Sequence, residues 1–402
     1  MFFSISKITA DDRFINHYKA NSFYISLDNG WSKFDTENGR VFFKGYSDEH
    51  ISLENCVSEK LIDPTPSNSG NFCVIIVNNN QLTITHDINR GFPLKEYSDG
   101  KITNLLDSDV SVKEHIWSDC YITVNDDKLT KHYFDSAMTD IVDVSETECV
   151  DNIVNLLNNK AKNLKNFDNV NVFLSGGVDT TLVYSLIKKH LDNNQYNIVA
   201  SEHLEFTPFF LKNFSTFTTL PEMWGYKQFH HWKKPTLYAT GGMGDEIFMR
   251  GPTTVALWAA WHNIDLIKEF ENIDYSYHKK YFLKEKNRKA ISQQWKNRKQ
   301  IQNKLKTKAE LHTEIRNNVL NDHQHWHLEN TISWTPLKDV RILNTMLGLP
   351  IGVLLEQIIH GSIDKKIISR IYPGLEEIVC THKNHNQYNK LLLHNDFVKV
   401  LK

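Results

Sequence analysis

The spacing of apolar residues changes once along the chain, from the short period of β-strands to the longer period of helices. Residues 74–77 are an apolar run, residues 78–80 are three asparagines typical of a turn, and in residues 82–85 apolar side chains alternate with threonines. This pattern predicts a β-hairpin. Similar short runs separated by turns continue to about Phe134, so the first part of the chain is predicted to be rich in β-strands.

The second part of the chain begins with a helical period, because apolar residues recur on one stripe through residues 150–164. Strands are predicted at residues 170–174, 198–200 and 237–240, with helix or loop between them. Strands connected in this way form a parallel sheet that carries binding sites at its strand carboxyl ends. The change of period predicts a domain boundary within residues 135–148, and 402 residues are enough for two domains, each with its own core.

A glycine-rich turn joins the first of these strands to a helix predicted over residues 181–191. The turn is Ser175-Gly176-Gly177-Val178-Asp179-Thr180. Two consecutive glycines let the backbone pass close to phosphate oxygens, and the start of the following helix favours an anion. The Asp179 carboxylate cannot itself bind phosphate, so we expect it to hold a Mg²⁺ that does. The turn predicts a nucleotide with its metal, and a plain tight connection is the alternative.

A second glycine-rich loop, Thr240-Gly241-Gly242-Met243-Gly244-Asp245-Glu246-Ile247-Phe248, follows the last predicted strand. The first turn resembles the Ser-Gly-Gly-x-Asp-Ser/Thr signature of ATP pyrophosphatases. The second loop resembles Ser-Gly-Glu-Gly-Ser-Asp-Glu-Leu-Phe of asparagine synthetases, without a gap. In that family two aspartates share the Mg²⁺ on the ATP phosphates, and the resemblance gives this role to Asp179 and Asp245. A Walker-type phosphate loop is absent from the sequence.

Weaker matches flank the two loops, in the order that the family has them. Residues 335–339 resemble its Pro-Phe-Leu-Asp segment, and residues 381–384 lie where the family places a C-terminal lysine, here Lys383. Upstream, residues 70–76 and 86–94 resemble segments of the amino-terminal glutaminase-like domain. The similarity is therefore spread over most of the chain and is strongest at the two loops.

This resemblance implies an α/β fold with two domains. Residues 1–140 would form a degenerate glutamine amidotransferase-like domain, which is β-rich and of the Ntn type. Residues 150–402 would form an asparagine synthetase-like α/β ATP pyrophosphatase domain of the adenine nucleotide α-hydrolase type, with a parallel sheet.

Several departures from the family bear on the chemistry. Asparagine synthetases carry a cysteine directly after the initiator methionine as the glutaminase nucleophile, and Phe2 stands there in this chain, so we expect no glutamine hydrolysis. In this respect the chain resembles β-lactam synthetase and the lasso-peptide cyclases. Gly242 and Ile332 stand where asparagine synthetases have glutamates, so a general base must come from elsewhere, and Glu329 is a nearby candidate.

The resemblance implies a ligase that uses ATP and Mg²⁺ to adenylate a carboxylate and transfers the acyl group to an amine or ammonia, releasing AMP and pyrophosphate. The substrates would be a small-molecule or peptide carboxylate and an amine. Lys383 would stabilise the negative charge that develops during amine attack. The residues expected at the nucleotide are Leu174 beside the adenine, Ser175, Gly176, Gly177, Asp179 and Thr180 from the first turn, and Gly241 and Gly242 from the second loop.

Charge is distributed unevenly along a chain whose net charge is only −2. Residues 279–308 hold twelve lysines and arginines against one acid, Glu285. A solvated helix packed on one side is the favoured interpretation of this segment, and a nucleic-acid-binding surface is the alternative. Two other functions therefore stay open: an ATP pyrophosphatase that modifies a nucleic-acid base, and a non-catalytic nucleotide-binding paralogue.

Composition and the N-terminal pattern favour a cytoplasmic protein. No apolar run approaches the ~20 residues of a membrane span, and the first residues lack the layout of a signal peptide. Five scattered cysteines without Cys-x-x-Cys spacing predict neither a disulfide framework nor a zinc site.

Overall fold

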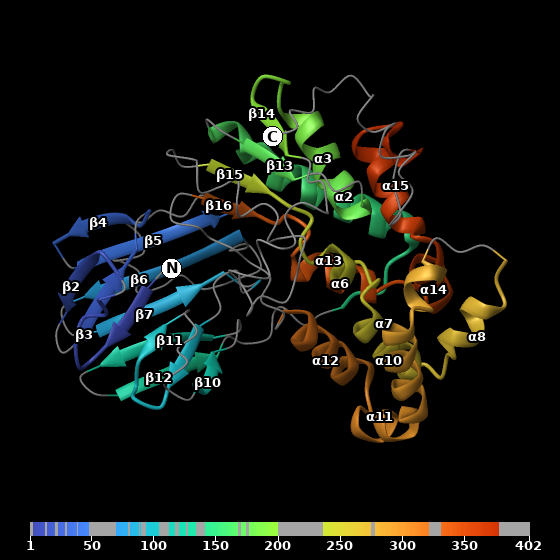
Figure 1. Ribbon diagram of the computed structural model, residues 1–402, viewed down its shortest axis with the longest axis horizontal. Helices are drawn as coiled ribbons and strands as arrows, with labels where there is room; N and C mark the ends of the chain where they lie inside the picture. The colour runs from blue at the N-terminus through green and yellow to red at the C-terminus, as the bar shows by residue number, and fades with distance from the viewer. Residues whose placement is uncertain are drawn as a thin grey trace. The chain divides into compact units, whose positions relative to one another are not determined.

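The contacts of the chain divide it into two compact units in the computed structural model (Figure 1). Unit 1 comprises Met1–Met138, Thr207–Tyr238 and His323–Trp334, and unit 2 comprises Thr139–Phe206, Ala239–Asp322 and Thr335–Lys402. Within them the structure describes residues 3–12, 14–20, 23–28, 30–37, 39–47, 70–78, 81–87, 89, 94–103, 112–116, 120–125, 128–133, 141–167, 170–173, 177–199, 236–274, 278–320 and 331–377.

Unit 1 contains two six-stranded sheets in which all the described pairings are antiparallel. The predicted hairpin is confirmed, with Val77 opposite Leu82 across the turn. The first sheet has the order β10 (Val112–Ile116), β8 (Leu94–Tyr97), β9 (Ile102–Thr103), β1 (Phe3–Ser6), β3 (Phe23–Leu27), β2 (Asn16–Ala20). The second has the order β12 (Lys128–Tyr133), β11 (Cys120–Asn125), β7 (Gln81–His86), β6 (Gly70–Asn78), β5 (Gly39–Ser47), β4 (Ser32–Thr36).

The core of unit 1 forms because alternate side chains of each strand point to one face of the sheet. Apolar side chains from the two sheets join in one buried cluster, and the ring of Tyr18 on β2 lies 4.8 Å from that of Phe42 on β5. The packing of two sheets face to face is a β-sandwich. The buried members of the cluster include Phe3, Ile5, Ile25 and Leu27 from the first sheet and Phe42, Ile75, Ile84 and Ile122 from the second.

Unit 2 begins with helix α2 (Glu146–Lys162), which starts four residues before the predicted helical period. The reason is a capping box at Ser145: the Glu148 backbone N–H donates to Ser145 Oγ (3.3 Å), and the Ser145 N–H donates to Glu148 Oε2 (2.8 Å). The predicted apolar stripe is confirmed, because Val150, Ile153 and Leu157 are buried.

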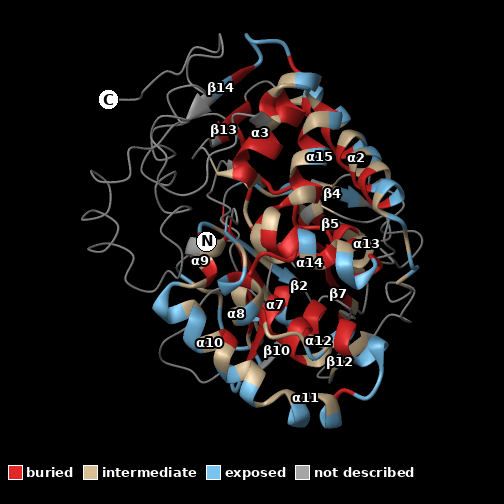
Figure 2. Ribbon diagram, turned by 90° about the vertical axis from the view of Figure 1, so that its right-hand side faces the viewer, coloured by how far each residue is buried: buried red, intermediate tan, exposed pale blue. Residues whose placement is uncertain are grey.

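A small four-stranded sheet carries the two glycine-rich loops, and its one described pairing is parallel, as predicted. Its order is β14 (Tyr196–Val199), β13 (Val170–Phe173), β15 (Thr236–Ala239), β16 (Thr331–Trp334), and β13 pairs with β14 in parallel. Helix α3 (Val178–His190) starts three residues before its predicted position, because the helix begins inside the glycine-rich turn. Figure 2 shows the dense burial of α3, which packs with α2 and α15 (Ser362–Ile371).

The basic segment folds as three helices and not as one long helix. These are α9 (Lys279–Phe282), α10 (Glu285–Lys296) and α11 (Arg298–Lys304). Helix α10 packs against α7 (Pro252–Trp261), and Ile291 is its one buried residue. The remaining helices of unit 2 are η1 (Asn163–Asn166), α6 (Gly244–Ile247), α7 (Pro252–Trp261), α8 (Leu266–Glu271), α12 (Lys308–Leu320), α13 (Val340–Leu347), α14 (Ile351–His360) and η2 (Leu375–Glu377).

None of the helices in the described part of the chain is, by itself, long and apolar enough to cross a bilayer. Only α13 and α14 taken together have the length and composition, and they are bent by 118°.

Candidate functional site

The two glycine-rich loops lie directly against each other in unit 2. A Cβ atom added at Gly241 would lie 2.7 Å from the backbone carbonyl carbon of Asp179, and one added at Gly244 would lie 2.2 Å from its carboxylate oxygen Oδ1. Real Cβ atoms do not approach other atoms so closely. At Gly241 the clash is with the backbone of the first loop, so a side chain there would separate the loops, whereas at Gly244 it is with the Asp179 side chain, which would have to move. Gly241 is therefore required for the second loop to reach the start of α3.

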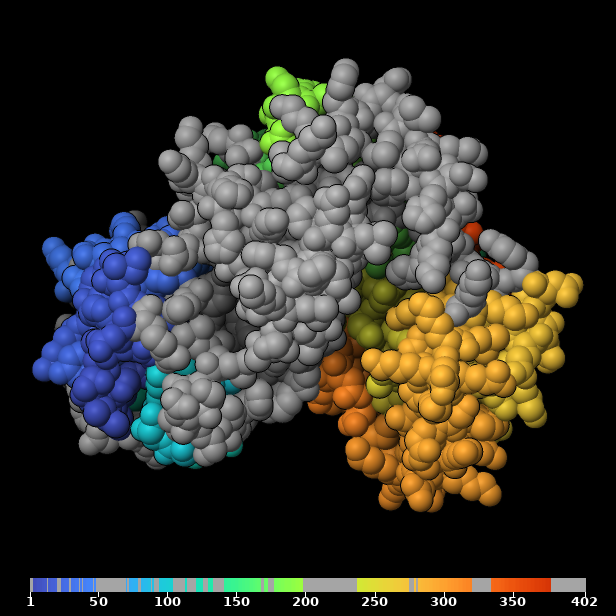
Figure 3. All heavy atoms as spheres, in the orientation of Figure 1, coloured from blue at the N-terminus to red at the C-terminus, as the bar shows by residue number. Residues whose placement is uncertain are grey.

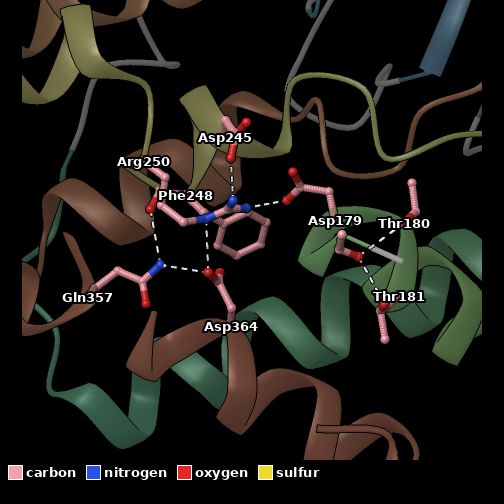
Figure 4. Close-up of polar contacts among 9 residues, drawn as sticks. Asp179, Thr180, Thr181, Asp245, Phe248, Arg250, Gln357 and Asp364 are labelled. Atoms are coloured by element: carbon pink, nitrogen blue, oxygen red, sulfur yellow. Dashed lines mark hydrogen bonds and ion pairs between the residues drawn. The ribbon is translucent and has the colours of Figure 1, made fainter. Parts of the chain in front are cut away.

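The first loop is fixed by side-chain hydrogen bonds at the start of α3. The hydroxyl groups of Thr180 and Thr181 donate to the carbonyl oxygen of Gly177 at 3.1 and 2.9 Å (Figure 4). Gly177 is the N-cap residue and has no side chain to bond the first backbone N–H groups of the helix. An anion at this helix start would meet donors that no side-chain cap occupies.

The second loop turns back on itself through two residues with left-handed backbone conformation. Met243 (φ 65°) precedes α6, and Met249 (φ 56°) follows it. The backbone N–H groups of Arg250 and Gly251 both donate to the carbonyl oxygen of Asp245, at 2.6 and 2.8 Å. These bonds bring Arg250 back beside Asp245, the residue that the sequence assigns to the metal.

The guanidinium of Arg250 lies at the centre of a carboxylate cluster (Figure 4). Nη2 contacts Asp179 Oδ1, Nη1 contacts Asp245 Oδ1, and Nε lies 2.9 Å from Asp364 Oδ2. The Arg250 side chain is 4% exposed and that of Asp364 is 1% exposed, whereas that of Asp245 is 45% exposed. The cluster thus has a buried back at Asp364 and an open edge at Asp245.

Gln357 of α14 supports this buried back. Its side-chain amide nitrogen donates to Asp364 Oδ2 (3.0 Å) and to the carbonyl oxygen of Phe248 (3.2 Å). Its Oε1 accepts a hydrogen bond from the backbone N–H of Ile363 (2.7 Å). The amide therefore joins α14, the start of α15 and the end of the second loop.

The electrostatics of the cluster are unbalanced. Burial raises the pKa of Asp179, to about 7, although Arg250 opposes the shift, and burial also raises the pKa of Asp364. Burial disfavours the charged guanidinium of Arg250, but the carboxylates around it, Asp179 first, outweigh this and raise its pKa. Three carboxylates against one guanidinium leave two negative charges in excess when all are ionised, which matches the charge of one divalent cation.

The donor set fits Mg²⁺ bound together with phosphate and does not fit a site built by protein alone. Among the residues that the structure describes, no three His, Cys, Asp or Glu side chains are grouped to hold a metal. Mg²⁺ commonly takes one or two carboxylates and completes its shell with substrate phosphates and water. Asp179 and Asp245 would be those two carboxylates, with Arg250 on one oxygen of each.

The structure brings together several of the residues that the sequence predicts at the site. Gly177, Asp179, Thr180, Gly241 and Asp245 lie in the two adjoining loops, as does Gly242, whose N–H donates to Thr240 Oγ1 (3.2 Å). The predicted residues Leu174, Ser175, Gly176, Glu329 and Lys383 lie outside the described residues.

Sequence reasoning missed the three residues that hold the cluster together: Arg250, Asp364 and Gln357. Arg250 lies two residues after the loop that resembles asparagine synthetases. Its nearness in sequence to Asp245, a predicted metal ligand, is the one feature of the sequence that could have indicated a role. Asp364 and Gln357 come from a later part of the chain with no local motif.

Asp339, the last residue of a segment that resembles the family, belongs to a different ion pair. Its carboxylate is fully buried and lies 2.8 Å from the Lys160 ammonium on α2 and 2.8 Å from the Arg341 guanidinium. Burial alone would raise the pKa of Asp339, but Lys160 and Arg341 hold it well below its usual range. Its Oδ1 also accepts from the Arg341 N–H at the start of α13. Asp339 therefore joins α2 to α13 and shares no ion pair with Arg250.

Comparison with known proteins adds little to this geometry. No family model matches the chain, and no curated protein matches it. Among solved structures, the chain is similar to an allosteric regulatory enzyme of purine biosynthesis (9% identity, 37% of this chain and 46% of that chain, TM-score 0.22). It is also similar to glutamine phosphoribosylpyrophosphate amidotransferase from B. subtilis, solved with ADP and GMP (9% identity, 57% and 63%, TM-score 0.22). The chain thus spans about half to two thirds of their lengths, and similarities this low carry no argument about fold or chemistry.

Proposed function

We propose that this protein is an ATP- and Mg²⁺-dependent ligase of the asparagine synthetase type, without glutaminase activity. In this reaction a carboxylate oxygen of one substrate attacks the α-phosphorus of ATP and pyrophosphate leaves. An amine or ammonia then attacks the acyl carbon, gives up a proton, and AMP leaves. The products are an amide, AMP and pyrophosphate.

The observation that carries the proposal is the meeting of two distant glycine-rich loops at one pair of aspartates. Gly241 and Gly244 allow the loops to touch, and Asp179 and Asp245 contact the same guanidinium. A tight turn alone would explain one glycine-rich loop, but it would not explain why both loops carry a carboxylate to the same point. When all three carboxylates are ionised, the two excess negative charges there favour a divalent cation.

Each described residue has a definite part in this proposal. Gly177 and Thr180 at the start of α3 would face the pyrophosphate, together with the predicted contacts from Ser175 and Gly176. A bound Mg²⁺ would neutralise charge on the phosphates. Asp179 and Asp245 would hold this ion.

Two further roles rest on the resemblance alone and stay predictions. Lys383 would stabilise the charge that develops as the amine attacks, and Glu329 is the candidate for the general base. A Lys383→Ala variant should lose amide formation by on the order of a hundredfold while it still binds ATP.

The two cysteines whose side chains the structure describes, Cys73 and Cys149, do not favour glutaminase chemistry. Burial raises the pKa of the Cys73 thiol well above its usual range and that of Cys149 to about 12. Both thiols are buried, so neither is suited to act as a thiolate nucleophile.

The direct test is ATP–pyrophosphate exchange with the purified full chain, screened against amino acids, peptides and tRNA. Exchange that depends on a carboxylate, followed by AMP release when an amine is added, is the expected result. No exchange and no AMP release with any substrate class would contradict the proposal.

A second candidate function, modification of a nucleic-acid base, is favoured only by the basic helices. Figure 3 shows α10 and α11 (orange) at the surface, and Lys296 and Lys299 on them are exposed. If tRNA alone supports exchange in the same screen, this candidate replaces the first.

A further inference from the structure

Arg250 touches both aspartates to which the proposed function gives the metal, although no sequence motif assigns it a role. We infer that Arg250, fixed from behind by Asp364 and Gln357, is a positioning residue that sets the spacing of Asp179 and Asp245 for the divalent cation. This inference rests on the proposed function and adds to it a device that the two loops do not supply.

The shape of the guanidinium sets the spacing of the two aspartates. It contacts Asp179 through Nη2 and Asp245 through Nη1, so a single rigid plane fixes the distance between one oxygen of each carboxylate. Lysine carries the same charge but is a point donor on a flexible stem, so it cannot impose this spacing. The second oxygen of each carboxylate has no described contact with Arg250.

Arg250 itself is held in place. Its Nε forms an ion pair with Asp364 Oδ2 at 2.9 Å, without the geometry of a hydrogen bond, and Gln357, which is fully buried, donates to Asp364 Oδ2 and to the Phe248 carbonyl oxygen. The other oxygen of Asp364, Oδ1, is buried and has no hydrogen-bond partner among the described residues. The charge of Asp364 is thus compensated by Arg250 and the Gln357 amide, and movement of Arg250 would leave a buried carboxylate without its cation.

The charge of Arg250 also bears on the spacing. Without the guanidinium the three carboxylates would repel one another, and the two aspartates would separate. With it the repulsion is reduced, and one oxygen of each aspartate is left without a described contact to Arg250. The guanidinium therefore prepares the aspartates for the cation and does not replace it.

The test measures the binding of a fluorescent N-methylanthraniloyl ATP by the full chain at increasing Mg²⁺ concentration. The Mg²⁺ concentration at half-maximal binding, the Mg²⁺ midpoint, is compared between the unmodified protein and its variants. Mn²⁺ binding followed by EPR is a second measurement. Arg250→Lys keeps the charge and removes the fork, so we expect it to raise the Mg²⁺ midpoint about 10- to 100-fold. Asp364 pairs with Arg250 and has no described contact with Asp179 or Asp245. We therefore expect Asp364→Asn to raise the Mg²⁺ midpoint by a smaller factor. Lys160→Met breaks a separate buried ion pair of the same unit and should leave the midpoint unchanged.

An unchanged midpoint in Arg250→Lys would overturn the inference while the proposed function stands. If Arg250→Lys does not fold, Asp364→Asn decides, and an unchanged midpoint there has the same meaning. An equal shift in Lys160→Met would also overturn it, because general destabilisation would then explain the effect. If the unmodified protein shows no Mg²⁺-dependent ATP binding, the proposed function itself fails, and the inference with it.

Discussion

Asp179 and Asp245 share one guanidinium but differ in their surroundings. The side chain of Asp179 is 19% exposed and that of Asp245 is 45% exposed, and burial raises the pKa of Asp179. A neutral asparagine at position 179 removes a charge that burial disfavours, so Asp179→Asn should unfold at the same temperature as the unmodified protein or a higher one. Both Asp179→Asn and Asp245→Asn should abolish adenylation, because each removes a proposed ligand of Mg²⁺.

The measurement is pyrophosphate exchange together with the melting temperature of each variant. Asp192→Asn, at an exposed position after α3, is the matched control and should leave both quantities unchanged. Exchange that persists in either Asp179→Asn or Asp245→Asn would refute the assignment of a shared metal.

The sequence identifies these aspartates because each lies in a short motif whose backbone demands are local. Arg250 and Asp364 could not be predicted in the same way. Their roles depend on where the left-handed turn at Met249 and the packing of α15 bring them, and both are long-range properties of the fold.

Two buried histidines make the stability of unit 2 sensitive to acid. Burial lowers the pKa of His278 and of His312 to about 4, and neighbouring cations add to the shift. A histidine that is neutral in the folded state takes up a proton more readily in the unfolded state. The free energy of unfolding is therefore highest above a pH of about 6.5 and decreases as the pH falls towards about 4. Between pH 8 and pH 5 the free energy of unfolding of His312→Gln should decrease by roughly 1–2 kcal/mol less than that of the unmodified protein, measured by urea unfolding. Parallel pH curves for the two proteins would show that His312 is not responsible.

Helices α2 and α13 are joined by the buried pair of Lys160 and Asp339, whose side chains are 3% and 0% exposed. Lys160→Met leaves the Asp339 carboxylate with Arg341 alone, and we expect it to lower the free energy of unfolding by about 3 kcal/mol. Lys162→Met, two residues further on the same helix and exposed, should change it by less than about 0.5 kcal/mol. Equal effects of the two substitutions in urea unfolding would show that the pair does not stabilise the protein.

The basic helices α10 and α11 bear on the choice between ligase and nucleic-acid enzyme. Part of their charge is met within the protein, because Arg288 pairs with Glu271 (2.7 Å) and Lys289 with Glu285 (2.7 Å). We therefore expect weak binding to tRNA or DNA.

The decisive comparison replaces Lys296, Arg298 and Lys299 together by glutamine and measures nucleic-acid affinity against salt concentration. An unchanged, shallow slope is the expected result. If the slope of log affinity against log salt concentration instead becomes shallower by the amount expected for the loss of about three phosphate contacts, these helices bind a phosphate backbone.

Elements with a strong period and a local start signal could be predicted closely, and others could not. The stripe of α2 and the hairpin of β6 and β7 follow from spacing that each segment carries itself. The basic segment gives no such signal, because its apolar residues are few. Its helices are interrupted at Leu283 and Asn297, where the sequence carries neither glycine nor proline to mark a break.

At the scale of the whole molecule, the change of period along the sequence corresponds to the change from the sandwich of unit 1 to the helices of unit 2. The sequence does not reveal that later segments return to unit 1, since 323–334 lies far along the chain. In contrast, every residue of the carboxylate cluster belongs to one unit, unit 2.

This separation predicts that damage to the core of unit 1 leaves nucleotide binding intact. Ile75 lies in the sandwich core and Ile358 in unit 2, and both are fully buried, so replacement of either by alanine should cost about 2–5 kcal/mol. A ligand that binds only the folded state stabilises it by about 2.7 kcal/mol at a concentration one hundred times its dissociation constant.

Ile75→Ala should retain this full stabilisation by Mg²⁺ and ATP. Ile358→Ala should retain less, because Ile358 adjoins Gln357 and its carbonyl oxygen accepts from His278 Nδ1 (2.8 Å). If Ile75→Ala is folded but loses the stabilisation by ligand, unit 1 contributes directly to nucleotide binding, and the assignment of the metal ligands and their cluster to unit 2 alone does not account for that binding.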